Sequence, residues 1–275
     1  MLQKILDSAF QKHQIQYWGL CPIEPLLPFF ANSAAARAPS HVKSAIVCLI
    51  PYYTGEHPER NLSHYAIIPD YHIVVGKMLQ EVCELLAQHY PQNTFVPFVD
   101  VSPIDEVKAA SLCGLGNIGP SSLLINREYG ALCFIGSILS DLGASAVIRA
   151  GNEGCILCGR CITACPAAAI SSQGIDPSRC LSALTQQKKE LSPEQTKLIR
   201  QNKLAWGCDQ CSLACPIPRK RSPIRAFSEQ VIPTANLQNL DQLMINRAFA
   251  YRGKKVMLRN LNILDSTEKP PAESV

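Results

Sequence analysis

The chain has 275 residues, of which 47% are hydrophobic and 17% are charged, and its formal net charge is +4 at pH 7. This composition is typical of a globular protein and excludes a largely disordered one, and the length suffices for one large domain or two modest ones. No signal peptide and no apolar run of about 18 residues is visible. We therefore expect neither export nor a membrane span, and the thirteen cysteines then indicate a reducing compartment, the cytoplasm.

Alternating helices and strands are predicted over the first half of the chain. Apolar residues recur at helical spacing over residues 3–13 and again from Tyr71 to near Pro91. A third predicted helix covers residues 104–113 and stops at Gly114, a residue type that commonly ends helices.

Continuous apolar runs predict the strands. Residues 45–50 indicate a buried central strand. Residues 94–99 indicate an edge or bulged strand, because Pro97 interrupts them. Two further runs, residues 122–125 and 131–139, would add two strands. The alternation of strands and helices predicts an N-terminal α/β domain.

Gly114, Gly116 and Gly119 follow the GxGxxG pattern of dinucleotide-binding turns. That fingerprint should follow a strand and open a helix, whereas these glycines follow a predicted helix. A close approach of backbone segments, or a turn packed over a flat cofactor, explains them better than a nucleotide site.

Eight of the thirteen cysteines lie in one segment. A first run, C-x2-C-x2-C-x3-C-P, ends at Pro166, a second, C-x2-C-x3-C-P, ends at Pro216, and one cysteine stands between them. Eight thiolates are what two [4Fe–4S] clusters need, and in ferredoxin-type runs the fourth cysteine binds the other cluster. We therefore predict one cluster on Cys155, Cys158, Cys161 and Cys215, and a second on Cys165, Cys180, Cys208 and Cys211.

Two other uses of these cysteines are weaker interpretations. Zinc sites also contain C-x2-C pairs, but rarely a run of four cysteines that ends in Cys-Pro. A disulfide framework is typical of short secreted chains, and nothing marks this chain for secretion.

The carboxyl-terminal part of the chain is basic. Residues 1–180 contain 11 Lys and Arg against 14 Asp and Glu, a net charge of −3, whereas residues 181–275 contain 15 against 8, a net charge of +7. A basic part could bind a polyanion such as RNA. The alternative is a solvated basic face that also offsets the negative charge of two thiolate-bound clusters.

Helical signals recur in this basic part. Pro193 in Ser-Pro-Glu indicates a helix start, and residues 236–257 show helical spacing. The predicted fold is of mixed α+β and α/β class. It has an α/β domain over residues 1–150, a ferredoxin-like double [4Fe–4S] cluster domain over residues 151–222 and a short helical segment over residues 223–275.

Several motifs, taken in order, resemble the epoxyqueuosine reductase family from about residue 40 to residue 264. They are Asp70-Tyr71-His72, Asp100-x2-Pro103-x2-Glu106, the glycine turn, both cysteine runs, Arg179-Cys180-Leu181, Arg252 and Arg259-Asn260. The resemblance is to a short form, since many full-length members extend into C-terminal helical repeats.

This resemblance implies a reductase that depends on cobalamin and two [4Fe–4S] clusters, with the cobalamin over the α/β domain. The substrate would be epoxyqueuosine in tRNA, reduced to queuosine with electrons from an external donor such as flavodoxin or ferredoxin. Asp100 matches the family's proposed proton donor. His72, Gly114, Gly116 and Gly119 would contact the cofactor.

The residues alone leave two roles open for Asp100. At the end of a buried strand, beside an apolar corrin face, its charged form would be desolvated, so a protonated carboxyl could donate to the leaving oxygen. Alternatively, Asp100 caps the helix that begins near Pro103. His72 could equally be a structural histidine, and Glu106 could bind a ribose or an amide or simply be a first-turn helix carboxylate.

Two departures from the family keep other functions open. The family usually has a basic residue where this chain has Val107, and its usual Gly-Lys-Asn-Thr reads Gly-Pro-Ser-Ser from Gly119 to Ser122. One alternative is a cobalamin and iron–sulfur reductase of a small molecule, as in reductive dehalogenases. The other is a ferredoxin-like electron-transfer protein.

Overall fold

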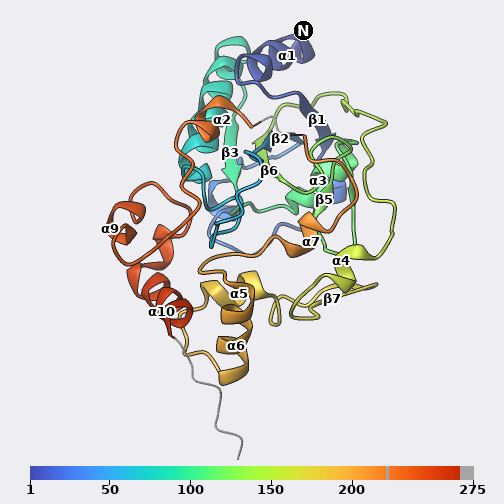
Figure 1. Cartoon of the computed structure of the whole chain (residues 1–275). Helices are drawn as coiled ribbons and strands as arrows, with labels where there is room; N and C mark the ends of the chain where they lie inside the picture. The colour runs from blue at the N-terminus through green and yellow to red at the C-terminus, as the bar shows by residue number, and fades with distance from the viewer. Residues whose placement is uncertain (221–222, 267–275) are drawn as a thin grey trace, which may run out of the picture.

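A four-stranded sheet forms the centre of the molecule (Figure 1). The computed structural model describes residues 1–220 and 223–266, and all neighbouring strands in this sheet run antiparallel. The predicted alternation of helices and strands is confirmed, but the strands do not pair in the parallel arrangement of helix crossovers, so the α/β class that the alternation predicts for residues 1–150 is corrected to α+β. The strand order is β1 (Tyr17–Pro22), β2 (Ser44–Pro51), β6 (Cys133–Ser140), β3 (Phe95–Val99).

The strand β2 is central and buried along its whole length, as its apolar sequence predicts. Its even-numbered side chains from Ile46 to Ile50 pack with helices α1 (Leu2–Lys12) and α2 (Tyr71–His89). Its odd-numbered side chains from Ala45 to Leu49 pack with helix α3 (Glu106–Leu112) on the other face. Because successive side chains of a strand point to opposite faces, one apolar run serves two hydrophobic layers.

The two edge strands differ in how well the sequence predicts them. The strand β3 carries Pro97 and lies at the edge of the sheet, as expected for a residue without an N–H group. The opposite edge, β1, was not predicted. Its interior Gly19 weakens a strand pattern, but a Cβ atom there would lie 2.6 Å from the Cβ atom of Cys113, so the glycine lets α3 approach the sheet.

The described residues of the cysteine-rich part form short strands and helices below the sheet, of which α6 (Pro193–Asn202) is the longest (Figure 1). Two one-turn helices, α4 and α7, follow cysteines of the first and second runs and lie against each other. The predicted helix start at Pro193 is confirmed, and Ser192 caps that helix with a capping box. The elements of this part are α4 (Arg160–Thr163), β7 (Ile170–Ser171), β8 (Gly174–Ile175), α5 (Leu181–Gln186), α6 (Pro193–Asn202) and α7 (Gln210–Leu213), and the short strands β4 (Asn117–Ile118) and β5 (Leu124–Ile125) precede it in the chain.

The carboxyl-terminal segment packs on the same core as α2, through side chains such as Phe227, Phe249 and Met257. The helical spacing of residues 236–257 does not give one helix, because Asn246 and Gly253 have positive φ angles of 58° and 88°. Its elements are α8 (Arg225–Ser228), α9 (Leu240–Leu243), η3 (Ala250–Arg252) and α10 (Lys254–Asp265); two further 3-10 turns, η1 (Glu24–Leu26) and η2 (Ala35–Arg37), precede β2.

The predicted end of the cluster domain, residue 222, and the last part of the third segment, residues 267–275, lie outside the described residues. None of the helices within residues 1–220 and 223–266 is long and apolar enough to cross a membrane.

Candidate functional site

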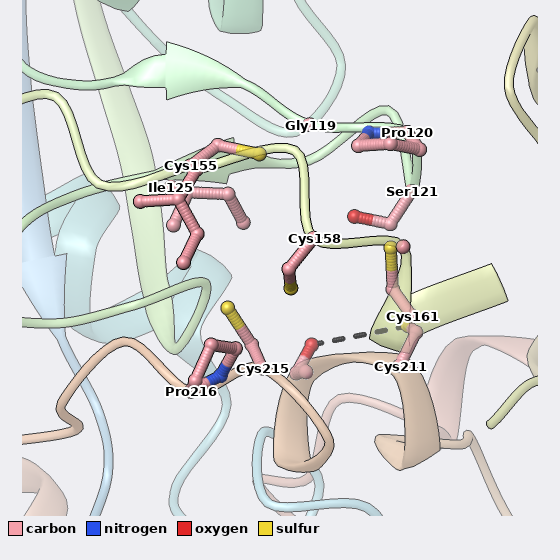
Figure 2. A pocket seen from close by; sticks show the side chains of 13 residues that line it. Gly119, Pro120, Ser121, Ile125, Cys155, Cys158, Cys161, Cys211, Cys215 and Pro216 are labelled. Atoms are coloured by element: carbon pink, nitrogen blue, oxygen red, sulfur yellow. Dashed lines mark hydrogen bonds between the residues drawn. The ribbon is translucent and has the colours of Figure 1, made fainter. Parts of the chain in front are cut away.

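One pocket gathers the four cysteines predicted for the first cluster. Figure 2 shows Cys155 and Cys158 on the loop above it, Cys161 at the start of the short helix that follows this loop, and Cys215 on the segment below. Cys215 therefore meets residues some sixty positions earlier in the chain, as the crossed assignment requires. Cys211 also lines this pocket.

The turn at Gly119 forms one wall of this pocket (Figure 2). A Cβ atom at Gly119 would lie 3.2 Å from the Sγ atom of Cys155, so only glycine leaves the sulfur its present place. Asn117 fixes the start of the loop, because its Oδ1 accepts from the N–H groups of Gly154 and Cys155 at 3.0 and 2.8 Å. The absence of a Cβ atom at Gly119 thus leaves a cradle for the sulfur of Cys155, one of the predicted cluster ligands.

The second cysteine group lies beside a different, larger cavity of about 410 Å³. Cys180, Cys208 and Cys211 line this central cavity. Burial raises the pKa of the Cys208 thiol to about 12 and that of Cys211 to about 11, so bound metal is needed to hold them as thiolates near neutral pH. Cys165, the fourth predicted ligand, does not line the cavity, and its sulfur accepts from the N–H group of Ala169 at 3.2 Å.

The cysteines form no cross-links, since all thirteen are free thiols. Within residues 1–220 and 223–266, no group of three or more His, Cys, Asp or Glu side chains is close enough to hold a single metal ion.

Six aromatic side chains contribute to the wall of the central cavity. Tyr71 stacks on Phe134 with ring centres 4.1 Å apart and planes 13° apart. The Nε1 atom of Trp206 is buried without a hydrogen-bond partner among the described residues. Such a wall offers flat apolar surfaces and one unused donor to a ligand. The aromatic lining residues are Tyr52, Tyr65, Tyr71, Phe134, Trp206 and Tyr251.

Asp100 and His72 lie together in the wall of this cavity. The Nε2 atom of His72 is 3.4 Å from Oδ2 of Asp100, and its Nδ1 atom is 2.8 Å from Oδ1 of Asp70. Burial opposes protonation of His72, but the hydrogen bonds to Asp100 and Asp70 outweigh it and raise its pKa to about 9. The histidine is therefore a cation near neutral pH.

The structure excludes one of the two roles that the sequence left open for Asp100, that of the cap of helix α3. The residue that caps α3 is Asp105, whose carboxylate accepts from the N–H group of Lys108 at 2.9 Å. Asp100 instead follows β3 with a positive φ angle of 64°, and its side chain is 58% exposed. The protein atoms alone thus do not provide the burial that we expected around this carboxyl.

Glu106 lies outside the central cavity, in contrast to Asp100 and His72. It begins α3, is half-buried, and accepts a hydrogen bond of 2.6 Å from the Ser137 hydroxyl. Burial raises its pKa to about 8. Since Glu106 does not line the central cavity, neither the ribose nor the amide contact has support in the geometry.

Gly114 and Gly116 also lie away from the cavity. A Cβ atom on either would come within 2.6 Å of a backbone carbonyl oxygen, that of Arg149 for Gly114 and that of Ile125 for Gly116. The structure thus gives these glycines the close backbone approach that the sequence allowed. Of the three glycines, only Gly119 lines a site where we predict a cofactor, and that site is the pocket of the first cysteine group.

Sequence reasoning missed the ion pair between Arg60 and Asp209. Asp209, between Cys208 and Cys211, is buried, and its Oδ2 atom lies 3.2 Å from Nη1 of Arg60 and accepts from the N–H group of His64 at 2.7 Å. The acidic residue within the second cysteine run was the available signal, but its partner is some 150 positions earlier and no local pattern indicates it.

Comparison with known proteins supports both halves of this description. Residues 34–101 match the family model described as epoxyqueuosine reductase QueG, DUF1730, and residues 154–218 match the 4Fe-4S double cluster binding domain. The second match confirms the prediction of two [4Fe–4S] clusters at the level of the domain.

Curated relatives carry the same family name. The epoxyqueuosine reductase of Escherichia coli strain K12 is 38% identical over 156 residues, which are 56% of this chain and 41% of the relative. That of Gloeobacter violaceus is 33% identical over 195 residues, 68% of this chain and 60% of the relative. The chain thus spans less than two thirds of the length of these relatives.

Solved structures share the fold. Epoxyqueuosine reductase from Streptococcus thermophilus matches with a TM-score of 0.80 at 20% identity, over 96% of this chain and 80% of that one. An epoxyqueuosine reductase with a tRNA-Tyr epoxyqueuosine-modified stem loop matches with a TM-score of 0.77 at 17% identity, over the same shares. The reductive dehalogenase NpRdhA matches at 0.50 and 17% identity, over 91% of this chain and 34% of that one. The predicted resemblance to the epoxyqueuosine reductases is therefore confirmed.

Proposed function

We propose that this chain, which resembles the epoxyqueuosine reductases in sequence and in fold, is an iron–sulfur reductase that converts epoxyqueuosine in tRNA to queuosine. One observation carries the proposal. A single cavity has Asp100 and His72 in its wall together with Cys180, Cys208 and Cys211 of the second cysteine group. Loss of the epoxide oxygen as water consumes two electrons and two protons, so the reaction needs an electron path and a proton donor that meet at one place.

The two cysteine groups would hold the two clusters. The gathering of Cys215 with the first run supports the crossed ligand sets that the sequence predicts. Cys165 completes the second set in this proposal. Since α4 and α7 lie against each other, the two clusters would be neighbours, with the second beside the central cavity.

The aromatic wall of the central cavity would hold cobalamin. Tyr71, Phe134 and Trp206 provide apolar surfaces that suit a corrin ring, and the unpartnered Nε1 donor of Trp206 would bind one of its polar groups. When bound, cobalamin supplies the low-potential cobalt chemistry that the clusters feed with electrons. Gly114 and Gly116 have no place in this site, and Gly119 belongs to the first cluster.

The proton delivery would depend on the pair Asp100 and His72. Asp100 lines the cavity, where its carboxylate can take a proton from His72 and pass it to the leaving oxygen. His72, cationic near neutral pH, lies within reach of the same carboxyl and can return a proton to it. Asp70 holds the imidazole in place through Nδ1.

A second function keeps the same cofactors but acts on a small molecule. The fold similarity to the dehalogenase NpRdhA favours it, as does Val107 in place of the family's usual basic residue. A protein that binds cobalamin stoichiometrically but has no affinity for tRNA at low salt would support this alternative. A protein with two clusters and no cobalamin spectrum would instead be an electron carrier.

The test of the leading proposal is the nucleoside content of tRNA from cells that lack only this gene. We expect epoxyqueuosine to accumulate and queuosine to disappear, with rescue by the wild-type gene and not by Asp100→Asn. Undiminished queuosine in the deleted strain would refute the assignment. The electron donor, a flavodoxin or ferredoxin, and the cytoplasmic location remain parts of this proposal.

A further inference from the structure

Two grooves continue from the central cavity along the basic carboxyl-terminal part. The first, of about 630 Å³, shares Cys180, Ser182 and Gln186 with the cavity and is lined further on by Lys188 and Lys189. Its lining therefore leads from the proposed reaction site to the surface beside α5.

The second groove, of about 320 Å³, begins where the first ends. It shares Lys188 and Arg252 with the first groove and is also lined by Lys254 and Lys255 at the start of α10. We call the two together the basic groove.

The positive charge of the basic groove is largely uncompensated. Within the part of the chain that the structure describes, no Asp or Glu side chain lines either part. Lys254 pairs with Asp241, but Lys188, Lys189 and Lys255 are exposed and have no carboxylate partner among residues 1–220 and 223–266. A concave surface lined by one sign of charge concentrates ligands of the opposite sign.

The lysines of the first part stand on a fixed loop. The guanidinium of Arg259 on α10 donates to the carbonyl oxygens of Gln187 and Lys189 at 2.7 and 2.8 Å. Asn260 beside it donates to the carbonyl oxygens of Thr185 and Ala205, both at 2.7 Å. These bonds hold the backbone at the end of α5, so Lys188 and Lys189 are presented without a large ordering cost on binding.

Arg252 lies at the junction of the two parts. It lines both, and its Nε atom is buried without a hydrogen-bond partner among the described residues. Its guanidinium carbon lies 4.8 Å from the centre of the Tyr251 ring, and this ring is 62% exposed and lines the central cavity. An unused cationic donor beside an exposed aromatic ring suits a phosphate next to a base.

We propose that the basic groove binds the sugar–phosphate backbone of the RNA whose modified base enters the central cavity. This inference rests on the proposed function and adds the surface that positions the RNA. Its continuity with the cavity favours RNA over an acidic electron carrier, because the occupant's reacting group must reach Asp100. A carrier has another approach, through the exposed Cys158 of the first cysteine group.

The test compares two variants that each lose two exposed lysines. Lys188→Gln/Lys189→Gln removes charge from the basic groove. Lys12→Gln/Lys77→Gln removes it from a groove between α1, α2 and α8 on the opposite side of the molecule (Figure 1). The full chain with both clusters is titrated anaerobically with a fluorescent, unmodified tRNA anticodon stem loop at several salt concentrations. Iron content and melting temperature verify that both variants are folded.

We expect Lys188→Gln/Lys189→Gln to weaken binding roughly 10- to 50-fold at about 0.1 M salt and to lower the salt slope by about 0.7–0.9 per lost phosphate contact. The Lys12→Gln/Lys77→Gln control should bind like the wild type. If both variants bind the RNA equally well, or lose affinity equally, the proposal that the basic groove binds RNA is overturned, while the proposed function stands. If Lys188→Gln/Lys189→Gln binds RNA like the wild type but its clusters are reduced more slowly by an acidic electron carrier, the groove belongs to the carrier. That result would also overturn the proposal that the groove binds RNA. A wild-type protein that binds no RNA would end both proposals.

Discussion

The imidazole of His72 bridges towards the carboxylate of Asp100, with Nε2 and Oδ2 3.4 Å apart. The two residues come from different elements, since His72 lies in the first turn of α2 and Asp100 follows β3. Asp70 caps α2 and binds both the backbone N–H and the Nδ1 atom of His72. The helix cap thereby orients the imidazole at the rim of the central cavity.

The pair predicts a specific pH dependence for the reduction. Since the pKa of His72 is raised to about 9, the cation persists through neutral pH, and the single-turnover rate should fall only as the pH passes about 9. His72→Gln cannot titrate and should lower the rate and remove this alkaline limb. An unchanged limb in the variant would show that another group controls the protonation.

Asp100→Asn should lower the single-turnover rate about 10²- to 10⁴-fold, the usual contribution of a positioned general acid. Iron content and RNA affinity should stay at wild-type values, because the side chain is 58% exposed and its one side-chain hydrogen bond among the described residues is the contact with His72. A rate within a few-fold of the wild type would remove Asp100 from the mechanism.

Gly119 and Gly76 form a matched pair of Gly→Ala substitutions. At Gly119 the new methyl group would lie 3.2 Å from the Cys155 sulfur, so Gly119→Ala should lower the iron content from about eight towards four per chain. Gly76→Ala, in the interior of α2 with nothing within 4 Å of the new Cβ atom, should keep all the iron and stabilise the protein by about 1 kcal/mol. Full iron loading of Gly119→Ala would contradict the interpretation that the missing Cβ atom at Gly119 makes room for the Cys155 sulfur.

Paired cysteine substitutions test the crossed ligand sets. Cys155→Ser and Cys215→Ser should each cost one cluster, and their combination should cost no more, leaving about four irons per chain. Cys155→Ser/Cys208→Ser should lose both clusters. If Cys215 instead serves the cluster of its own run, then Cys155→Ser/Cys215→Ser would lose all the iron.

The raised pKa of Glu106 predicts that the free energy of unfolding depends on pH. The unfolded chain releases this proton near the ordinary value of 4.5, whereas the folded protein keeps it to about pH 8. The free energy of unfolding should therefore fall as the pH rises through that interval, by roughly 3–5 kcal/mol at most. Glu106→Gln should melt close to the wild type at about pH 4.5, the unfolded-state value, and increasingly above it as the pH rises to about 8. Parallel melting curves for the two proteins across this range would contradict the assignment.

The sequence predicts those parts of the fold that have a local signal. The apolar run of β2, the helical period of α2, the edge position of Pro97 and the capping box at Ser192 all agree with the structure. The strand β1 has a weaker sequence signal, because its interior Gly19 has low strand propensity. The glycine at this position instead allows α3 to approach the sheet. The antiparallel pairing could not be predicted, since alternation along the chain does not fix which strands become neighbours.

The candidate site likewise contains features that a local sequence pattern predicts and features that it does not. Cysteine spacing predicts which sulfurs gather around the first pocket, because short loops determine most of that geometry. The aromatic wall and the contact of Arg60 with Asp209 depend on residues distant in sequence, which no local pattern joins. The environment of Asp100 was expected to be buried, and the turn at its positive φ angle instead exposes the carboxyl.

The most direct measurement is nucleoside analysis after one anaerobic turnover of epoxyqueuosine-modified tRNA by the purified protein, loaded with both clusters and cobalamin and supplied with a strong reductant. We predict that queuosine appears with the wild-type protein and is absent with Asp100→Asn at the same iron and cobalt content. Intact epoxyqueuosine after incubation with a fully loaded wild-type protein that binds the tRNA would contradict the account.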